Sequence, residues 1–261
     1  ATATFTYQWQ LCADAACTSP IDISGATSTT YQIVAADYYP TNYYLRFKVT
    51  AAQTAYTTSI AYSTASLIGP AQFVAGTPTI DGTAKVGQVL TGNTGTWTPA
   101  AGSTYTYLWQ VSADGSTGWA TATGAGAATN QYTVATTDLG KYVRLAVTAA
   151  QNGFQTTTAY STSTAAVQAG SLSNLSAPLI YGVLDVGQTL TSDPGVWSPA
   201  SGNTYSYQWQ YSTDGLTWSN VSGGTNSTYT LLSANVGWVL RLLVSASQTG
   251  YVMVATATSG E

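Results

Sequence analysis

The chain contains no histidine, and only 6 of its 261 residues are lysine or arginine. Without histidine it has neither a Ser-His-Asp triad nor a histidine-ligated metal site. Six basic side chains in a chain of net charge −4 are too few to neutralise a phosphate backbone, which excludes nucleic acid as a partner. No apolar run reaches the roughly 18 residues of a membrane span, so we expect none in this chain.

Cysteine is also scarce, with only Cys12 and Cys17 present. Two thiols without a histidine cannot complete a four-ligand zinc site. The alternatives are a disulfide that closes a hairpin loop and a pair of free thiols, and we favour the disulfide. Such a bond persists only in an oxidising compartment, which indicates an exported protein. The sequence starts without a basic-then-apolar leader, so we expect any export signal to lie outside it.

What the chain does have is an internal repeat of 100 residues. A Tyr-x-Trp-Gln segment recurs three times, and its tryptophans are Trp9, Trp109 and Trp209. The second and third copies also share a Gly-x-Trp segment, which carries Trp97 and Trp197. A later Arg-containing segment appears three times, with Arg46, Arg144 and Arg241. We therefore divide the chain into a first repeat (residues 1–69), a second repeat (70–169) and a third repeat (170–261), joined by short links at 66–70 and 168–173.

Within each repeat the hydrophobic pattern has a period of two. In the segment before Gln110, for example, Tyr105, Tyr107 and Trp109 fall on one face while small or polar residues mostly fill the other. Turn residues separate such runs every eight to twelve positions. This pattern is typical of half-buried antiparallel strands. We predict that each repeat is a β-sandwich of about seven strands.

Two features resemble the tandem immunoglobulin-like repeats of bacterial surface and secreted proteins. One is the strand with a buried tryptophan, and the other is the strand entered through Asp138-x-Gly140-x-Tyr142. The resemblance implies an all-β fold of tandem immunoglobulin-like antiparallel β-sandwiches, and the short links favour an elongated rod. The sequence departs from antibody-type domains, because Arg144 stands where the second inter-sheet cysteine would fall and Val239 replaces the corner tyrosine in the third repeat.

The first repeat is shorter than the others at its start. It lacks the counterparts of residues 78–97, which should be its first two strands. A sandwich without two strands exposes core residues and open hydrogen-bonding edges, a state that natural proteins avoid. Two explanations stay open. The sequence is cut short here, or another molecule supplies the missing strands by strand complementation.

Candidate chemistry is sparse. Asp14, Asp114 and Asp214 recur once per repeat and are interpreted as turn formers, because calcium needs six or more oxygen ligands. Glycoside hydrolysis needs two carboxyl groups about 5–9.5 Å apart, and the only glutamate is Glu261. We expect no enzyme, no catalytic residue, no cofactor and no metal site.

The repeated arginines and two further tryptophans complete the set of candidates. The neighbours of Arg46, Arg144 and Arg241 are apolar, so each guanidinium should lie on the outer face of its sheet, over tyrosine or tryptophan rings. The alternative is a ligand contact repeated along the chain. Trp119 and Trp218 follow the Asp-Gly turns and are the candidates for exposed rings that contact glycans. Packing within the hairpin is the competing explanation.

Taken together, the sequence predicts a non-enzymatic extracellular or cell-surface structural protein of bacterial type. It would serve as a stalk, an adhesin segment or a self-assembling filament subunit, with self-association as the expected partner interaction. The alternative is an array of carbohydrate-binding modules that uses exposed tryptophan and tyrosine side chains.

Overall fold

The computed structural model describes residues 2–38, 43–252 and 255–259. Within these ranges the regular structure is almost entirely β-strand. The exceptions are the four-residue helix α1 (Ala35–Tyr38) and the 3-10 turns Thr136–Asp138 and Ser233–Asn235. The strand pairs are antiparallel, apart from one short parallel pair in the third repeat. This confirms the predicted all-β class.

The described chain forms two compact units, each assembled from segments that are separate in the sequence. The first unit holds residues 1–79, 94–107 and 146–161. It contains one sheet from the first repeat, in which β2-β1-β3-β4 lie in that order and β5 also pairs with β3. The bounds of these strands are β1 (Thr4–Cys12), β2 (Ile21–Asp22), β3 (Tyr44–Ala52), β4 (Ser59–Tyr62) and β5 (Ser66–Leu67).

An aromatic cluster from the second repeat also belongs to the first unit. Phe73 packs edge-on against Trp97 and lies 5.1 Å from Phe154, measured between ring centroids. Trp97 also lies 5.9 Å from Tyr105, and its indole N–H donates to the Thr94 carbonyl at 2.8 Å. The buried Trp97 ring therefore has both apolar neighbours and a satisfied polar atom.

The second unit holds residues 80–93, 108–145 and 162–261. Two strands, β8 (Thr104–Ser112) and β11 (Tyr142–Ala150), contribute residues to both units. The second repeat has a three-stranded sheet in the order β10-β7-β6 and a four-stranded sheet in the order β12-β11-β8-β9. The other bounds are β6 (Thr79–Asp81), β7 (Val89–Asn93), β9 (Ala120–Thr121), β10 (Gln131–Thr133) and β12 (Thr157–Tyr160).

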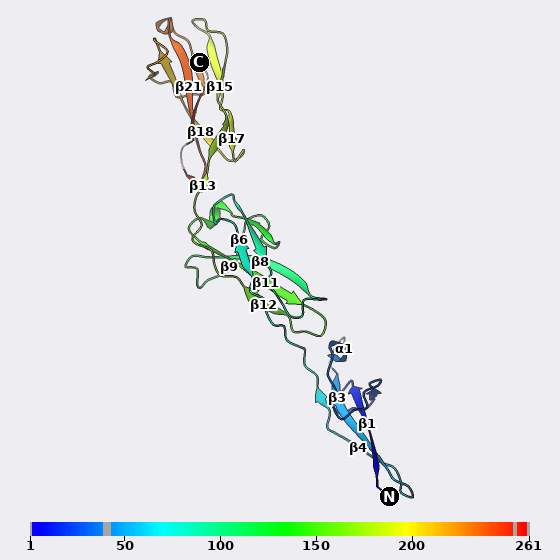
Figure 1. The fold of residues 1–261 in the computed structure, drawn as a ribbon. Coiled ribbons are helices and arrows are strands. Elements are labelled where there is room, and N and C mark those ends of the chain that lie inside the picture. The colour runs from blue at the N-terminus through cyan, green and yellow to red at the C-terminus, as the bar shows by residue number, and fades with distance from the viewer. Residues whose placement is uncertain (1, 39–42, 253–254, 260–261) are drawn as a thin grey trace. The chain divides into compact units, whose positions relative to one another are not determined.

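The third repeat, at the top of Figure 1, has the same two sheets. They are β15-β16-β20 and β19-β18-β21-β23, where β15 is Leu179–Tyr181, β16 is Thr189–Asp193, β18 is Thr204–Ser212, β19 is Ser219–Asn220, β20 is Thr228–Thr230, β21 is Val239–Ser247 and β23 is Ala255–Thr258. Two short pairs complete it. One is the parallel pair of β13 (Gly170–Ser171) with β22 (Tyr251–Val252), and the other is the antiparallel pair of β14 (Ser173–Ser176) with β17 (Val196–Ser198).

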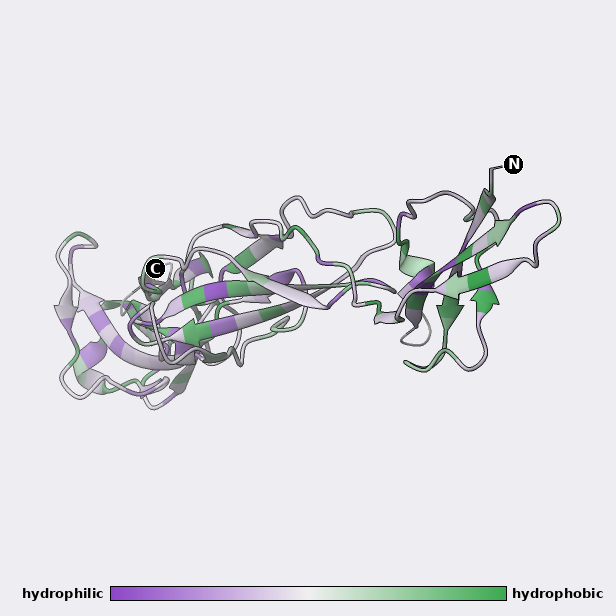
Figure 2. Ribbon diagram, turned by 90° about the horizontal axis from the view of Figure 1, so that it is seen from below, coloured by the Kyte–Doolittle hydropathy of each residue, from purple (hydrophilic) through white to green (hydrophobic). Residues whose placement is uncertain are grey.

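The two sheets of the third repeat share one core. Leu190 on β16, Trp209 on β18 and Leu242 on β21 are fully buried in a single cluster. The Trp209 indole N–H donates to the Asn226 carbonyl at 3.0 Å. Figure 2 shows hydrophobic and hydrophilic residues alternating along the strands, as a sheet with one buried face requires.

The first repeat departs from this arrangement. Trp9 and Phe47 pair across β1 and β3, and both are only half-buried, whereas their counterparts in the other repeats are fully buried. The physical reason is that no described strand of the first repeat corresponds to β6 or β7. Residues 28–34, the counterpart of the β10 region, form no strand, and the described residues include no counterpart of β7 with which they could pair. The inner face of this sheet is therefore partly open.

Candidate functional site

In each of the three repeats, a cluster of arginine, glutamine and an aromatic ring lies on the outer face of the sheet that contains the Tyr-x-Trp-Gln strand. Each arginine lies opposite a glutamine across the central strand pair and donates its Nε–H to the glutamine Oε1. The three pairs are Arg46–Gln10 (2.7 Å), Arg144–Gln110 (2.9 Å) and Arg241–Gln210 (2.8 Å). This bond holds the planar guanidinium flat against the sheet, in a position suited to stacking.

The exposed side of each guanidinium carries a ring. The distances from Cζ to the ring centroid are 4.2 Å for Arg46 over Tyr62, 4.2 Å for Arg144 over Trp119 and 4.1 Å for Arg241 over Trp218. Trp119 and Trp218 are half-buried, and one face of each ring is covered by the cation. A sugar stacks on an open ring face, so this packing removes one of the two faces that glycan binding could use.

We expect Arg241→Lys to lower the free energy of unfolding of the third repeat by about 1 kcal/mol, because lysine keeps the charge but loses both the planar stack and the Nε–H bond to Gln210. Chemical denaturation followed by circular dichroism measures the effect. A double-mutant cycle with Trp218→Ala should give a coupling energy above zero. Strict additivity would contradict a direct contact between the two side chains.

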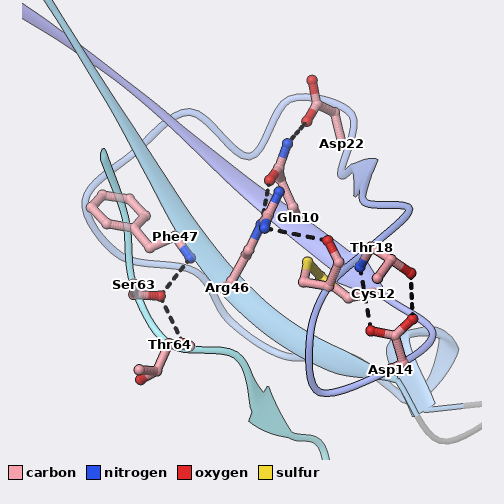
Figure 3. The surroundings of a disulfide bond; sticks show 10 residues. Gln10, Cys12, Asp14, Thr18, Asp22, Arg46, Phe47, Ser63 and Thr64 are labelled. Atoms are coloured by element: carbon pink, nitrogen blue, oxygen red, sulfur yellow. Dashed lines mark hydrogen bonds between the residues drawn. A yellow bond between two sulfur atoms is a disulfide. The ribbon is translucent and has the colours of Figure 1, made fainter. Parts of the chain in front are cut away.

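The cysteines lie at the end of β1, in the loop that follows it. Cys12 and Cys17 are joined by a disulfide with their Cα atoms 4.9 Å apart, and both are buried (Figure 3). The Asp14 carboxylate inside this loop accepts hydrogen bonds from the backbone N–H and the hydroxyl of Thr18, which lower its pKa. The Arg46 guanidinium reaches the Cys17 carbonyl at 3.5 Å. The disulfide loop therefore closes against the arginine cluster of the first repeat.

The double variant Cys12→Ser, Cys17→Ser should destabilise the first repeat by about 2 kcal/mol, because the unfolded chain regains the entropy of an open six-residue loop. Adding a reductant to the wild-type chain should have the same effect, with no change in the other two repeats. Hydrogen exchange resolved by peptide measures this. An equal loss of protection in the third repeat would contradict a local role for the bond.

A tyrosine and an acidic or amide side chain form a buried pair where the chain turns into the β3, β11 and β21 strands. The Tyr132 hydroxyl donates to the Asp138 carboxylate, which also accepts the Ala135 N–H at 2.9 Å. In the first repeat Tyr31 donates to Asp37 at 2.8 Å. Burial, and then the bond to Asp37, raise the pKa of Tyr31 to about 12. Because the raised pKa favours the protonated form, this contribution to stability is complete below pH 10 and is lost as the pH rises toward 12.

The repeated aspartates organise the turn after each tryptophan strand. The Asp214 carboxylate accepts the backbone N–H groups of Leu216 (2.9 Å) and Thr217 (2.8 Å) and the Ser212 hydroxyl (2.8 Å). The Thr217 N–H, the Leu216 N–H and the Ser212 hydroxyl together hold the Asp214 pKa well below its ordinary value of 3.8. This is the bonding pattern of a turn, in which the carboxylate oxygens are used within the chain.

A folded-state pKa below the unfolded value means that Asp214 contributes stability above pH 3.8 and that this contribution is lost as the pH falls below that value. We therefore expect the Asp214 carboxyl in the folded chain to stay ionised at pH 3.8, as measured by carbon-detected NMR titration. Ser212→Ala should move the titration toward 3.8. A wild-type midpoint at 3.8 would contradict the bonding described here.

Several of these residues were not found by sequence reasoning. The three glutamines that hold the arginines were visible in the repeated Tyr-x-Trp-Gln segment, and their position opposite the arginines follows from the strand register. In the third repeat Asn235 takes the place of Asp37 and Asp138 and accepts the Tyr229 hydroxyl. No repeated motif in the sequence pointed to Asn235. Among the described residues, no three histidine, cysteine or acidic side chains lie together as metal ligands. In the same part of the chain, no helix is long and apolar enough to cross a membrane.

Comparisons with known proteins give a limited match. Residues 182–258, within the third repeat, match the family described as Domain of unknown function (DUF8696). No curated protein matches the chain. Similar solved structures include a Ca2+-stabilized adhesin that helps an Antarctic bacterium reach out and bind ice (14% identity, TM-score 0.32, 98% of this chain and 64% of that chain). Others are a tetra-tandem repeat from the extending region of a large adhesion protein (12%, 0.29, 99% and 66%) and the FN1–FN3 domains of chicken CNTN1 (14%, 0.21, 97% and 87%).

The chain thus spans less than two thirds of the length of the two adhesion proteins. The fold class rests on the structure of the second and third repeats, each of which has a three-stranded and a four-stranded sheet.

Proposed function

We propose that the chain is a non-enzymatic structural protein of the cell surface or extracellular space. It comprises three immunoglobulin-like repeats in tandem, at 1–69, 70–169 and 170–261, and serves as a stalk, adhesin segment or filament subunit. The observation that carries the proposal is that equivalent polar side chains of the repeats form hydrogen bonds and ring contacts within their own repeat. The arginines bind glutamines and rings, the turn aspartates bind backbone N–H groups, and the buried tyrosines bind an acid or amide.

This arrangement suits a structural spacer, because the polar groups of each repeat form hydrogen bonds within that repeat and stabilise its fold. The low charge, 6% of residues, and the exposed strand faces favour association with copies of the same chain. The partly open inner face of the first repeat, with Trp9 and Phe47 half-buried, is where strand complementation would act.

Light scattering with negative-stain electron microscopy, from dilute to concentrated protein, tests the proposal. We expect elongated particles that associate into ordered assemblies as the concentration rises. Compact particles with no association would contradict it. For the carbohydrate-binding alternative, the expected result is no change in tryptophan fluorescence with soluble glycans, since one face of Trp119 and of Trp218 is already covered.

A further inference from the structure

One tight turn occurs at the same place in all three repeats, directly after β3, β11 and β21. It runs from a glutamine to an aromatic residue, at Gln53–Tyr56, Gln151–Phe154 and Gln248–Tyr251. In each turn the N–H of the aromatic residue donates to the glutamine carbonyl at 3.1 Å. In the first repeat the turn forms although the Tyr56 side chain is 72% exposed. The turn is therefore a preformed element of the repeat, with an aromatic ring at its end.

In the third repeat this turn pairs with the segment through which the chain enters the repeat. The Gly170 N–H donates to the Gly250 carbonyl at 2.9 Å, and β13 and β22 pair in parallel at this point. A Cβ added to Gly170 would overlap the Tyr251 ring, so the ring lies directly on the backbone of the entering segment. The turn therefore attaches this segment to the third repeat.

The same turn and segment also contact the second repeat. A Cβ on Gly250 would lie 2.9 Å from Cγ2 of Thr136, the first residue of a 3-10 turn in the second repeat, so the two residues are in close contact. The tyrosine hydroxyl at the end of the aromatic turn fills the space that a Cβ of Gly87 would take. The Lys85 ammonium donates to the Ser171 hydroxyl at 2.6 Å. The third repeat thus contacts the second through its aromatic turn and through its entering segment.

The second repeat contacts the first in the same way. The Ala71 N–H donates to the Gly153 carbonyl at 2.9 Å, and the Ala71 carbonyl accepts the Gln155 N–H at 2.9 Å. A Cβ on Gly153 would lie 2.7 Å from the Cβ of Ala35, the first residue of α1. Ala35 and Thr136 are equivalent, because each lies two residues before the aspartate of the buried tyrosine–acid pair. The two contacts are therefore built alike.

The connection between the second and third repeats is very short. Gln168 is bonded within the second repeat, where its carbonyl accepts the Val86 N–H at 3.0 Å and its N–H donates to the Ala84 carbonyl at 2.9 Å. Gly170 is already bonded to the third repeat, so a single residue, Ala169, lies between the two sets of bonds.

The connection between the first and second repeats is nearly as short. The Ile68 N–H donates to the Tyr43 carbonyl at 2.9 Å within the first repeat, and Ala71 is bonded to the second. Gly69 and Pro70 lie between them, and the proline ring fixes the φ angle of Pro70. Neighbouring domains move freely when a flexible linker joins them, and neither connection in this chain is a linker of that kind.

We propose that the aromatic turn is a joint between neighbouring repeats. Its partner surface is the short helical turn that begins at Ala35 in the first repeat and at Thr136 in the second, and the contact restrains the orientation of each repeat relative to the one before it. The inference rests on the tandem arrangement in the proposed function and deepens it, because a spacer transmits orientation only if its repeats do not rotate freely. The residues of each joint belong to a single compact unit.

Double electron–electron resonance on the full chain measures this restraint, with spin labels attached at Gln131→Cys and Thr228→Cys. These are exposed, equivalent positions on β10 and β20, one in the second repeat and one in the third. We expect one narrow distribution of distances between the labels. Tyr251→Ala removes the ring from the joint and should broaden the distribution at least about twofold, because the connection then behaves as an ordinary linker. Tyr251→Phe should leave it narrow, since Phe154 takes this place in the second repeat.

A matched pair of variants tests the partner surface. Thr136→Arg places a long charged side chain where the turn docks and should broaden the distribution as Tyr251→Ala does. Ser233→Arg makes the same kind of change in the corresponding 3-10 turn of the third repeat, outside both joints, and should leave the distribution unchanged. Circular dichroism checks that all variants fold, and the width measured without these substitutions stands even if one variant does not.

A broad distribution for the labelled chain without further substitutions would overturn the proposal. A narrow distribution that neither Tyr251→Ala nor Thr136→Arg broadens would also overturn it, as would equal broadening by Thr136→Arg and Ser233→Arg. The joint and the structural role fail separately. A narrow distribution in compact particles that do not associate would support the joint and contradict the role tested by light scattering.

Discussion

Replacing Trp209 by alanine should lower the free energy of unfolding of the third repeat by about 3–5 kcal/mol. The side chain is fully buried between the two sheets, in contact with the core that includes Leu190 and Leu242. Its removal leaves a cavity there and also leaves the Asn226 carbonyl without the indole donor. Scanning calorimetry of the full chain should show the transition of the third repeat at a much lower temperature, with the other transitions unmoved.

The matched control is Trp9→Ala, at the corresponding position of the first repeat. Trp9 is only half-buried, so we expect a loss of about 1–2 kcal/mol. The ratio of the two effects measures how open the inner face of the first repeat is in solution. Equal losses would show that something covers Trp9 to the same extent as Trp209, and would contradict the one-sheet description of the first repeat.

Asp138→Ala should destabilise the second repeat by about 2–4 kcal/mol. The carboxylate is buried and accepts hydrogen bonds from the Tyr132 hydroxyl and the Ala135 N–H. Alanine leaves both donors without a partner in a site that water does not reach. Denaturation in urea, followed by circular dichroism, gives the change in the midpoint at a constant slope.

The conservative variant Asp138→Asn separates the hydrogen bonds from the charge. In the third repeat Asn235 already accepts the same two bonds, from the Tyr229 hydroxyl at 3.0 Å and the Leu232 N–H at 2.7 Å. An amide oxygen is therefore sufficient for this geometry, and we expect Asp138→Asn to stay within about 1 kcal/mol of the wild type. If Asn and Ala were equally damaging, the charge rather than the bonding pattern would be the stabilising feature.

Much of the fold could be predicted from the sequence, because the period-two pattern shows which side chains of a strand lie on the buried face of its sheet. Tyr105, Tyr107 and Trp109 alternate along β8, and burial follows the same alternation. The internal repeat also indicated that the three arginines Arg46, Arg144 and Arg241 occupy equivalent positions. The structure places each of them over an aromatic ring, although the ring in the first repeat is Tyr62 from β4 rather than a tryptophan after the Asp-Gly turn.

The remaining features depend on long-range pairing, which a single sequence does not specify. Residues 167–168, for example, are held by backbone hydrogen bonds to Gly140, Lys141 and Val86, distant positions whose side chains carry no pattern for this pairing.

Single-molecule force spectroscopy of the full chain, pulled from its two ends, tests the tandem arrangement most directly. Independent repeats should unfold one at a time. The second and third repeats, of about 100 residues each, should each release roughly 300–360 Å of chain, and the first a shorter length. One event that releases nearly the whole chain, roughly 900 Å, would mean a single cooperative body and would contradict the account.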